Sequence, residues 1–171
     1  TPLMSIQGYA EGLSKGIFSR TKETADLIAQ ESRRLNALVE ELLTLSRIES
    51  GNYAPVNERI NLCNAMMVLV DEDLLFKAVY NVLTNAIKYA RTQVKVTLRK
   101  EGNSAVVMIL DDGEGISPND LPHIFKRFYK GKKGNFGLGL AIAKSSVELM
   151  NGKISVENKG GALFRISLPL Q

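Results

Sequence analysis

Apolar residues recur every seven positions early in the chain, and this spacing is the strongest restriction on what the sequence can fold into. The two series are Ile28, Leu35 and Leu42, and Leu38 and Leu45. Heptad spacing puts apolar side chains on one narrow stripe of a helix, as in helices that associate with other helices. Gly51 follows where a glycine commonly ends a helix. The pattern therefore predicts one long helix over residues 21–50.

A shorter apolar pattern precedes this helix. Pro2 suits the first turn of a helix, and Gly16 interrupts the pattern that follows it. Thr21 is a candidate N-cap of the second helix, and Glu23 would favour the positive end of its dipole. Residues 1–52 thus predict a helical hairpin. Two helices bury little apolar surface by themselves, so we expect a second copy to complete a four-helix bundle.

From about residue 68 the periodicity changes to that of strands and helices. Strands are predicted at residues 94–99, 105–110, 153–158 and 162–170, and helices at about 72–90 and 138–150. Hairpins of strands interleaved with helices indicate an α+β fold, a sandwich with helices on one face of the sheet. We therefore predict a second domain over residues 53–171.

The stretch between Gly51 and Asn81 is harder to interpret. The segment ERINLCNAMM (58–67) resembles the beginning of a helix, and VLVDEDLL (68–75) resembles the end of a strand that enters the next helix. Their junction at Met67 and Val68 is abrupt. We interpret it as a place where residues are absent from the given sequence; the alternative, a real deletion, would remove an edge of the sheet and expose the core.

Composition excludes several kinds of function. The chain of 171 residues has one cysteine, Cys63, and one histidine, His123, so neither a disulfide framework nor a His/Cys zinc site is expected. The net charge of +4 comes without a dense Lys/Arg tract, which suits an anionic ligand better than nucleic acid. No apolar run approaches the roughly 20 residues of a membrane span. We expect any membrane segment to lie outside this chain.

The segment NVLTNAIKYA (81–90) places two carboxamides on one face of a predicted helix. Asn81 and Asn85 are four residues apart, among residues typical of a helix core. Such a pair can cap a neighbouring loop, or it can turn two oxygen atoms toward a ligand. The segment alone leaves both interpretations open.

The segment DDGEGI (111–116) follows an apolar strand. Gly113 and Gly115 would let the backbone approach a flat ligand, and the Asp111 carboxylate can accept a hydrogen bond from an amino group. The alternative is a simple Asp-Gly turn. An EF-hand is excluded because acidic residues are missing at the required loop positions.

A second glycine-rich stretch, KGKKGNFGLGL (130–140), precedes a patterned helix. Backbone N–H groups at a helix N-terminus, with lysines nearby, can bind phosphate. The stretch matches neither the P-loop nor the GxGxxG dinucleotide pattern. A flexible surface loop is the alternative.

Taken in order, NVLTNAIKYA, DDGEGI, IFKRFYKG and GLGLAI resemble the N, G1, F and G2 boxes of sensor histidine kinases. These two-component enzymes bind ATP in a Bergerat (GHKL) fold, and they carry a dimerisation hairpin upstream, where this chain has its heptads. The resemblance covers nearly the whole chain. It implies that ATP and Mg²⁺ bind between the carboxamide-bearing helix and the two glycine-rich segments.

The resemblance also assigns roles to residues. Asn85 would coordinate Mg²⁺, Asn81 would position the phosphates or a metal-bound water, and Asp111 would accept from the exocyclic amine of adenine, favouring ATP over GTP. Lys88 would face phosphate, and Tyr89 the nucleoside. Lys130 would act near the γ-phosphate as a catalytic residue. The other residues assigned to the nucleotide site are Gly113, Gly115, Ile116, Gly137, Leu138, Gly139 and Leu140. The F-box residues Phe125, Phe128 and Tyr129 are expected to pack rather than to touch substrate.

The sequence departs from the family at its start. The family's first box reads H-E-x-x-T-P-L, and this chain begins with Thr1-Pro2-Leu3. The phosphoacceptor histidine is therefore expected immediately before Thr1, and His123 occupies a variable F-box position that does not replace it. The chain as given is expected to bind ATP without autophosphorylation. Thr1 matches a position that aims water when relatives dephosphorylate their partner.

The resemblance implies the kinase core of a sensor histidine kinase. The complete protein would transfer the γ-phosphoryl group to a histidine and then to an aspartate of a response regulator receiver domain. It would act as a homodimer, in the cytoplasmic part of a membrane-anchored sensor. Two rivals are a GHKL-type ATPase and a nucleotide-sensing scaffold without chemistry. The ATPases carry a glutamate base one turn before the metal-binding asparagine, where this chain has Asn81.

Overall fold

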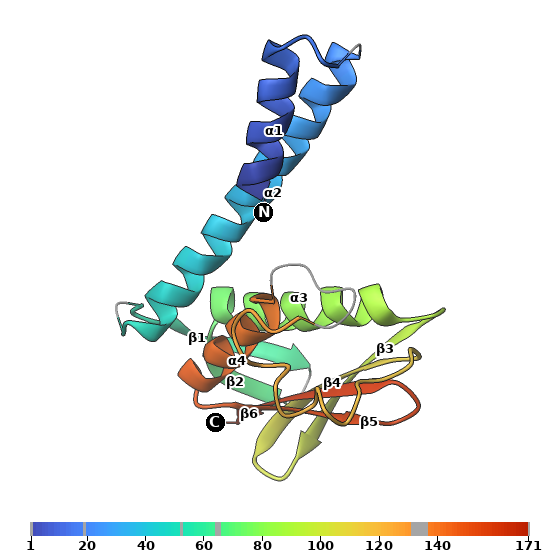
Figure 1. Ribbon diagram of the computed structural model, residues 1–171. Helices are drawn as coiled ribbons and strands as arrows, with labels where there is room; N and C mark the ends of the chain where they lie inside the picture. The colour runs from blue at the N-terminus through green and yellow to red at the C-terminus, as the bar shows by residue number, and fades with distance from the viewer. Residues whose placement is uncertain (1, 19, 52, 64–65, 131–136, 171) are drawn as a thin grey trace. The chain divides into compact units, whose positions relative to one another are not determined.

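The computed structural model describes residues 2–18, 20–51, 53–63, 66–130 and 137–170 (Figure 1). The chain forms two compact units, Thr1–Leu43 and Thr44–Gln171. Helix α2 belongs to both, because its residues continue from the first unit into the second.

The first unit contains two helices, as predicted. Helix α1 covers Pro2–Ser14 and helix α2 covers Thr21–Glu49. In the turn between them, the ring of Phe18 packs on Gly12, where an added Cβ would lie 2.0 Å from the ring. The Ile17 N–H also donates to the Gly12 carbonyl at 2.9 Å. No helix in the described part of the chain is long and apolar enough to cross a membrane.

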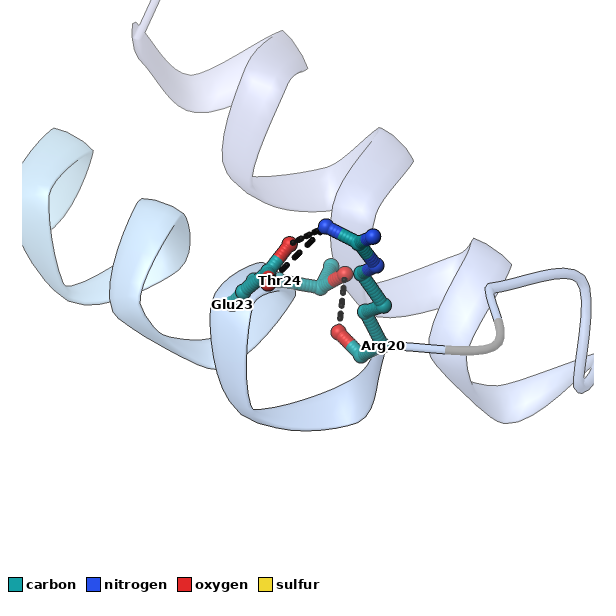
Figure 2. A network of polar contacts seen from close by, with 3 residues as sticks. All are labelled: Arg20, Glu23 and Thr24. Carbon is teal, nitrogen blue, oxygen red and sulfur yellow. Dashed lines mark hydrogen bonds and ion pairs between the residues drawn. The ribbon is translucent and has the colours of Figure 1, made fainter.

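The first turn of α2 is organised around Arg20 (Figure 2). The N–H and the hydroxyl of Thr24 both donate to the Arg20 carbonyl at 3.1 Å, and the Arg20 guanidinium contacts the Glu23 carboxylate at 3.2 Å. The residue whose carbonyl accepts the first intrahelical bond is the cap. Arg20 therefore occupies the cap position, and Thr21, the expected N-cap, is the first residue inside the helix.

The second unit is an α/β sandwich. Its elements are β1 (Asn57–Cys63), β2 (Met66–Asp71), α3 (Glu72–Tyr89), β3 (Val94–Glu101), β4 (Ser104–Asp111), α4 (Gly139–Leu149), β5 (Lys153–Asn158) and β6 (Ala162–Pro169). The main sheet has the order β3-β4-β6-β5 with antiparallel neighbours. Strands β1 and β2 form a separate antiparallel pair, which meets the end of the main sheet through a bridge between Val68 and Leu170.

The core lies between one face of the main sheet and helices α3 and α4, which contact each other (Figure 1). Phe164, Ile166 and Leu168 alternate along β6, and all three are buried in this core. Period-two spacing in the strand and spacing of three to four residues in the helices direct these side chains to one interior. Both predicted helices and the four predicted strands of this unit are confirmed, within one to two residues at their ends.

The last turn of α2 is part of the second unit. Ile48 is 6% exposed and packs in the core described above, and Leu45 is 2% exposed. A long helix that began as a hairpin in the first unit therefore ends with its side chains buried in the second. Leu45, which the heptad pattern assigned to the hairpin, thus belongs to the second unit.

One secondary-structure prediction was wrong. Residues 58–63, expected to begin a helix, lie in β1, where Ile60 pairs with Val68 of β2. Ile60 and Leu62 alternate along this strand and pack against the core. Period-two burial against a neighbouring strand outweighed the local preference for helix. Met67 and Val68, where the junction looked abrupt, are consecutive residues of β2.

Candidate functional site

The two asparagines lie at the edge of the buried face of α3. Asp71 caps the N-terminus of the helix, and its carboxylate accepts from the Leu74 N–H at 2.9 Å. The fully buried residues recur every fourth position, at Leu74, Ala78, Val82 and Ala86. Asn81 and Asn85 each precede one of these, and both are half-buried. The helix thus places both carboxamides along one margin of its core face.

Asn81 lies against the first residue of α4. Its Nδ2 donates to the Lys77 carbonyl at 2.8 Å, which leaves Oδ1 directed elsewhere. A Cβ added to Gly139 would lie 2.7 Å from this Oδ1. The N-box and G2-box segments, which are far apart in the sequence, therefore meet at Asn81 and Gly139.

Asp111 ends β4 in a buried position and is 3% exposed. Its Oδ1 accepts from the N–H of Gly113 at 2.9 Å and from the N–H of Ala162 at 3.2 Å. Its Oδ2 is buried and has no hydrogen-bond partner among the described residues. Leaving a buried carboxylate oxygen unpaired is costly, so this atom can accept a hydrogen bond from a donor that is not among the described residues, such as a water or a ligand.

Two glycines allow the backbone to crowd around Asp111. A Cβ on Gly113 would lie 2.3 Å from the Tyr89 carbonyl oxygen and 2.9 Å from Asp111 Oδ1. A Cβ on Gly161 would lie 1.9 Å from the Asp111 carbonyl oxygen. The G1 segment is therefore packed against the end of α3 on one side and the β5–β6 turn on the other. Sequence reasoning included Gly113 but missed Gly161.

Asp112 ties the G1 segment to the connection after α3. Its carboxylate accepts from the hydroxyl of Thr92 at 2.5 Å and from the N–H groups of Arg91, Thr92 and Gln93. These hydrogen bonds, that of the Thr92 hydroxyl first, hold the pKa of Asp112 well below its usual range. Sequence reasoning gave Asp112 no separate role, because its partners are about twenty residues away.

Asn158 fixes the other end of the G1 segment. Its Oδ1 accepts from the Ile116 N–H at 2.8 Å, and its Nδ2 donates to the Ile116 carbonyl at 2.7 Å. Gly115 has a φ of +76°, and a Cβ there would lie 2.7 Å from Asn158 Oδ1. Glycine is therefore needed at this position both for its backbone conformation and for space. Asn158 was not among the predicted site residues.

The F-box segment is anchored at two of its three aromatic residues. Phe125 packs edge-on against Phe164 in the core, with ring centroids 6.4 Å apart. The Tyr129 hydroxyl donates to Asp120 at 2.5 Å, and this hydrogen bond raises the pKa of Tyr129. Phe128 departs from the expectation that it packs, because it is 57% exposed. His123 packs beside Tyr129, with ring centroids 5.7 Å apart.

Phe128 and Gly137 form a backbone contact. The Phe128 N–H donates to the Gly137 carbonyl at 2.8 Å, and Phe128 has a φ of +60°. Gly137 has a φ of +74°, and a Cβ there would lie 2.5 Å from the Tyr129 carbonyl oxygen. The end of the F-box segment thus lies against the start of the G2 segment.

The remaining predicted residues occupy different environments. The ammonium group of Lys88 lies 5.6 Å from the ring centroid of Tyr89, whose pKa is raised by burial. The side chain of Leu138 is fully buried, so only its backbone is available to a ligand. Ile116 and Leu140 are half-buried against the core, and Lys130 is exposed. Thr1 and the glycines and lysines at positions 131–134 lie outside the described residues.

The donor set suits a metal that is shared with a ligand. Among the described residues, no three His, Cys, Asp or Glu side chains gather into a group that could hold a metal. Neutral carboxamide oxygens, such as those of Asn81 and Asn85, suit Mg²⁺ when phosphate oxygens supply the negative charge. The orientation of Asn81, with its nitrogen bound to Lys77, is consistent with such a role.

Two family models match the chain. Residues 70–171 match the model described as histidine kinase-, DNA gyrase B- and HSP90-like ATPase. Residues 1–51 match the His Kinase A (phospho-acceptor) domain.

Curated relatives align over the whole chain. Sensor histidine kinase CssS of Bacillus subtilis is 30% identical over 197 residues, which covers 99% of this chain and 44% of the relative. Sensor protein SphS of Synechococcus elongatus is 32% identical over 213 residues, which covers 99% of this chain and 52% of the relative. The chain thus spans about half the length of these relatives. Both alignments are longer than the chain, so the relatives have segments that it lacks.

Solved structures share the fold. The Acinetobacter baumannii histidine kinase AdeS has a TM-score of 0.82 and 24% identity, covering 100% of this chain and 96% of that one. The mycobacterial sensor histidine kinase MprB has a TM-score of 0.58 and 32% identity, covering 62% of this chain and 78% of that one. Both family models match in the expected order, and the motifs meet around Asp111 and Asn81; the chain belongs to the sensor histidine kinases of two-component systems.

Proposed function

We propose that this chain is the ATP-binding kinase core of a sensor histidine kinase, in which Asp111 recognises adenine. The observation that carries this proposal is the buried Asp111 Oδ2, which has no partner among the described residues. This oxygen can accept a hydrogen bond from the exocyclic amine of adenine. Guanine presents a carbonyl at the same position, so two acceptors would face each other. The site should therefore prefer ATP to GTP.

The rest of the Asp111 carboxylate is fixed before any ligand arrives. Two backbone N–H groups hold Oδ1, and Gly113 and Gly161 allow the surrounding backbone to approach closely. The second oxygen is thereby held in one orientation. Binding to such a preorganised acceptor requires little reordering of the protein.

On the phosphate side, Asn81 and Asn85 would hold a magnesium ion together with the phosphates. When bound, the ion would supply positive charge that stabilises the phosphoryl group as it leaves ATP. Gly139 leaves room beside Asn81 Oδ1, and the N–H groups of the first turn of α4 are available to an anion. Lys88 and Lys130 would add positive charge. Full-length ShkA in complex with AMPPNP has the same fold, with a TM-score of 0.76 and 20% identity.

The reaction would transfer the γ-phosphoryl group of ATP to a histidine of the complete protein and then to an aspartate of a response regulator. Catalysis would come mainly from positioning and charge neutralisation. The one histidine of this chain, His123, does not suit the role of acceptor, because its Nδ1 is buried and its ring packs beside Tyr129. Thr1 would take part in dephosphorylating the regulator.

The hairpin would form a homodimer. Leu27, Val39 and Leu43 of α2 are 41–52% exposed within the first unit. Covering these leucines and this valine with a second copy would remove apolar surface from water. We place this hairpin and core in the cytoplasmic part of a membrane-anchored sensor, as for sensor kinases generally.

A fluorescent ATP analogue titrated into the chain, with and without Mg²⁺, tests the nucleotide site. We expect binding that depends on Mg²⁺ and weakens about tenfold or more in Asp111→Asn, which replaces the free acceptor with a donor. The amide oxygen of the new asparagine can still accept from Gly113, so the fold should persist. Asp73→Asn, on an exposed position of α3, is the control and should bind normally.

Two results would contradict the proposal. Equal affinity for ATP and GTP would remove the role of Asp111, and absence of any nucleotide binding would leave only a scaffold. The transfer step is tested in a complete protein that carries a phosphoacceptor histidine. Labelled γ-phosphate should appear there as acid-labile phosphohistidine, and none would refute the kinase activity.

A further inference from the structure

The last residue of α2 makes a two-point contact with the F-box segment. The Arg127 Nε donates to Glu49 Oε1 at 3.1 Å, and its Nη2 forms an ion pair with Glu49 Oε2. Two parallel contacts between a guanidinium and a carboxylate fix orientation as well as distance. We infer that Glu49 and Arg127 are positioning residues for the phosphate side of the nucleotide site. This inference rests on the proposed function.

Arg127 precedes the strained residue of this segment. Phe128 has a φ of +60°, a conformation that a bulky side chain adopts only where its surroundings enforce it. Its ring is 57% exposed, so packing of the ring supplies little restraint. The flanking residues supply restraint: the Arg127 ion pair on one side, the Tyr129 hydrogen bond to Asp120 on the other, and the hydrogen bond from the Tyr129 N–H to the Lys126 carbonyl at 3.2 Å.

A backbone hydrogen bond connects Phe128 directly to the G2 segment. Its N–H donates to the Gly137 carbonyl, which precedes the buried Leu138 and then Gly139. Gly139 lies against Asn81. Each step from Glu49 to Asn81 is therefore a covalent bond, a hydrogen bond or ion pair, or a close approach. The ion pair thus holds the start of α4 in the position that the Asn81 carboxamide requires.

This pair is not needed to keep α2 attached. Ile48 and Leu45 are already buried in the second unit, whereas the side chains of Glu49 and Arg127 are 29% and 53% exposed. Exposed ion pairs add little to stability. A second pair of similar exposure, Arg165 with Glu101 at 2.6 Å, lies on the main sheet and provides a matched comparison. Loss of either pair should leave the free energy of unfolding almost unchanged. Only loss of the Glu49–Arg127 pair should change the nucleotide affinity.

The test compares Glu49→Gln, Arg127→Gln and the exchanged pair Glu49→Arg with Arg127→Glu, and uses Glu101→Gln as the control. We expect each single variant to lower the Mg²⁺-dependent affinity for the ATP analogue about two- to fivefold. The exchanged pair should recover most of that loss. Glu101→Gln should match the unaltered chain. Hydrogen exchange of the Phe128 amide, measured without nucleotide, should accelerate in the two single variants only.

The readouts separate the two proposals. If the unaltered chain binds no nucleotide, the proposed function fails, and Phe128 exchange alone decides this inference. If nucleotide binds but the single variants keep normal affinity and normal Phe128 exchange, the inference is overturned. It is also overturned if the exchanged pair is as impaired as the single variants, because charge complementarity would then have no role.

Discussion

A side chain on Gly139 would begin 2.7 Å from the carboxamide oxygen of Asn81, and the next two nearest atoms are also those of Asn81. The absence of a side chain at Gly139 therefore leaves space for the carboxamide of Asn81. The Asn81 side-chain nitrogen donates to the Lys77 carbonyl, so the carboxamide oxygen cannot turn away from Gly139 without breaking that hydrogen bond. The two residues must be accommodated together.

Replacing Gly139 by alanine should separate binding from stability. The residue is the first of α4 and lies in a helical conformation, where alanine is favourable, so the free energy of unfolding should change by less than about 1 kcal/mol. The new methyl group would displace Asn81 Oδ1. We expect Mg²⁺-dependent nucleotide affinity to fall about tenfold, equivalent to about 1.4 kcal/mol. Urea unfolding and nucleotide titration measure the two quantities.

Gly137→Ala is the contrasting variant. Its φ of +74° and the carbonyl of Tyr129 at 2.5 Å from an added Cβ leave a methyl group no space. Unlike Gly139→Ala, it should lower the free energy of unfolding by about 1–3 kcal/mol. If both alanine variants behaved alike, the distinction between a side-chain and a backbone neighbour would be wrong.

The last turn of α2 should stabilise the second unit. Ile48→Ala removes a side chain that is 6% exposed and packed in the core, and should lower the free energy of unfolding by about 2–4 kcal/mol. Ile87→Ala, on a position of α3 that is 61% exposed, is the matched control and should change it by less than about 0.5 kcal/mol. Urea denaturation followed by circular dichroism gives both values. Equal effects would place Ile48 outside the core.

Acid should destabilise the second unit through Asp71. Burial raises the pKa of Asp71, but hydrogen bonds from Leu74, Val56 and Tyr53 lower it by more, so the net pKa is below its usual value. A lowered folded-state pKa contributes stability that is present above the unfolded pKa of about 3.9 and is lost as pH falls through the folded value. We expect the melting temperature to drop below about pH 4.

Asp71→Asn supplies the comparison for this acid limb. Asparagine can still cap α3 through its oxygen, but it does not titrate. The variant should be less stable than the unaltered chain near pH 7 and should lose less stability on acidification. Asp112, whose pKa is also lowered, would still contribute to the acid limb in the variant. If the stability of Asp71→Asn fell with decreasing pH as steeply as that of the unaltered chain, Asp71 would not contribute to the acid destabilisation.

Asn158 should hold the G1 segment in place for the adenine base. Asn158→Ala removes both hydrogen bonds to Ile116 and should weaken nucleotide binding about three- to tenfold, since each bond contributes about 1 kcal/mol or less. Asn158→Asp keeps the acceptor for the Ile116 N–H and loses the donor. Its nucleotide affinity should therefore lie between that of the unaltered chain and that of Asn158→Ala. Titration with the ATP analogue orders the three proteins. The same affinity in all three would exclude this role.

Local patterns in the sequence were enough to predict the helices, hairpins and turns that carry the candidate site. Helical spacing places Asn81 and Asn85 on one face, and Gly113 and Gly137 lie in glycine-rich stretches, but the roles proposed for these residues came from the resemblance to sensor histidine kinases. The helices and hairpins around them also have clear periods. These features depend on neighbours a few residues away, so the sequence displays them directly.

Contacts between distant segments were not predictable in this way. Arg127 meets Glu49, and Asn158 meets Ile116, only because the sandwich brings different turns together. The strand at Asn57–Cys63 was mistaken for a helix for the same reason: its partner, β2, decides its conformation. A polar residue on an exposed turn carries no local sign that it holds another backbone in place.

Because α2 is a single helix that ends inside the second unit, the number of residues in it determines the direction in which its side chains point around the helix axis. Each residue of an α-helix turns the chain by about 100°. Inserting or deleting one residue in α2 ahead of Leu45 would therefore rotate the hairpin's apolar stripe by that angle with respect to the buried Ile48. Chimeras that exchange hairpins between relatives should preserve this helical phase, and a mismatch of one or two residues should be far more disruptive than one of seven.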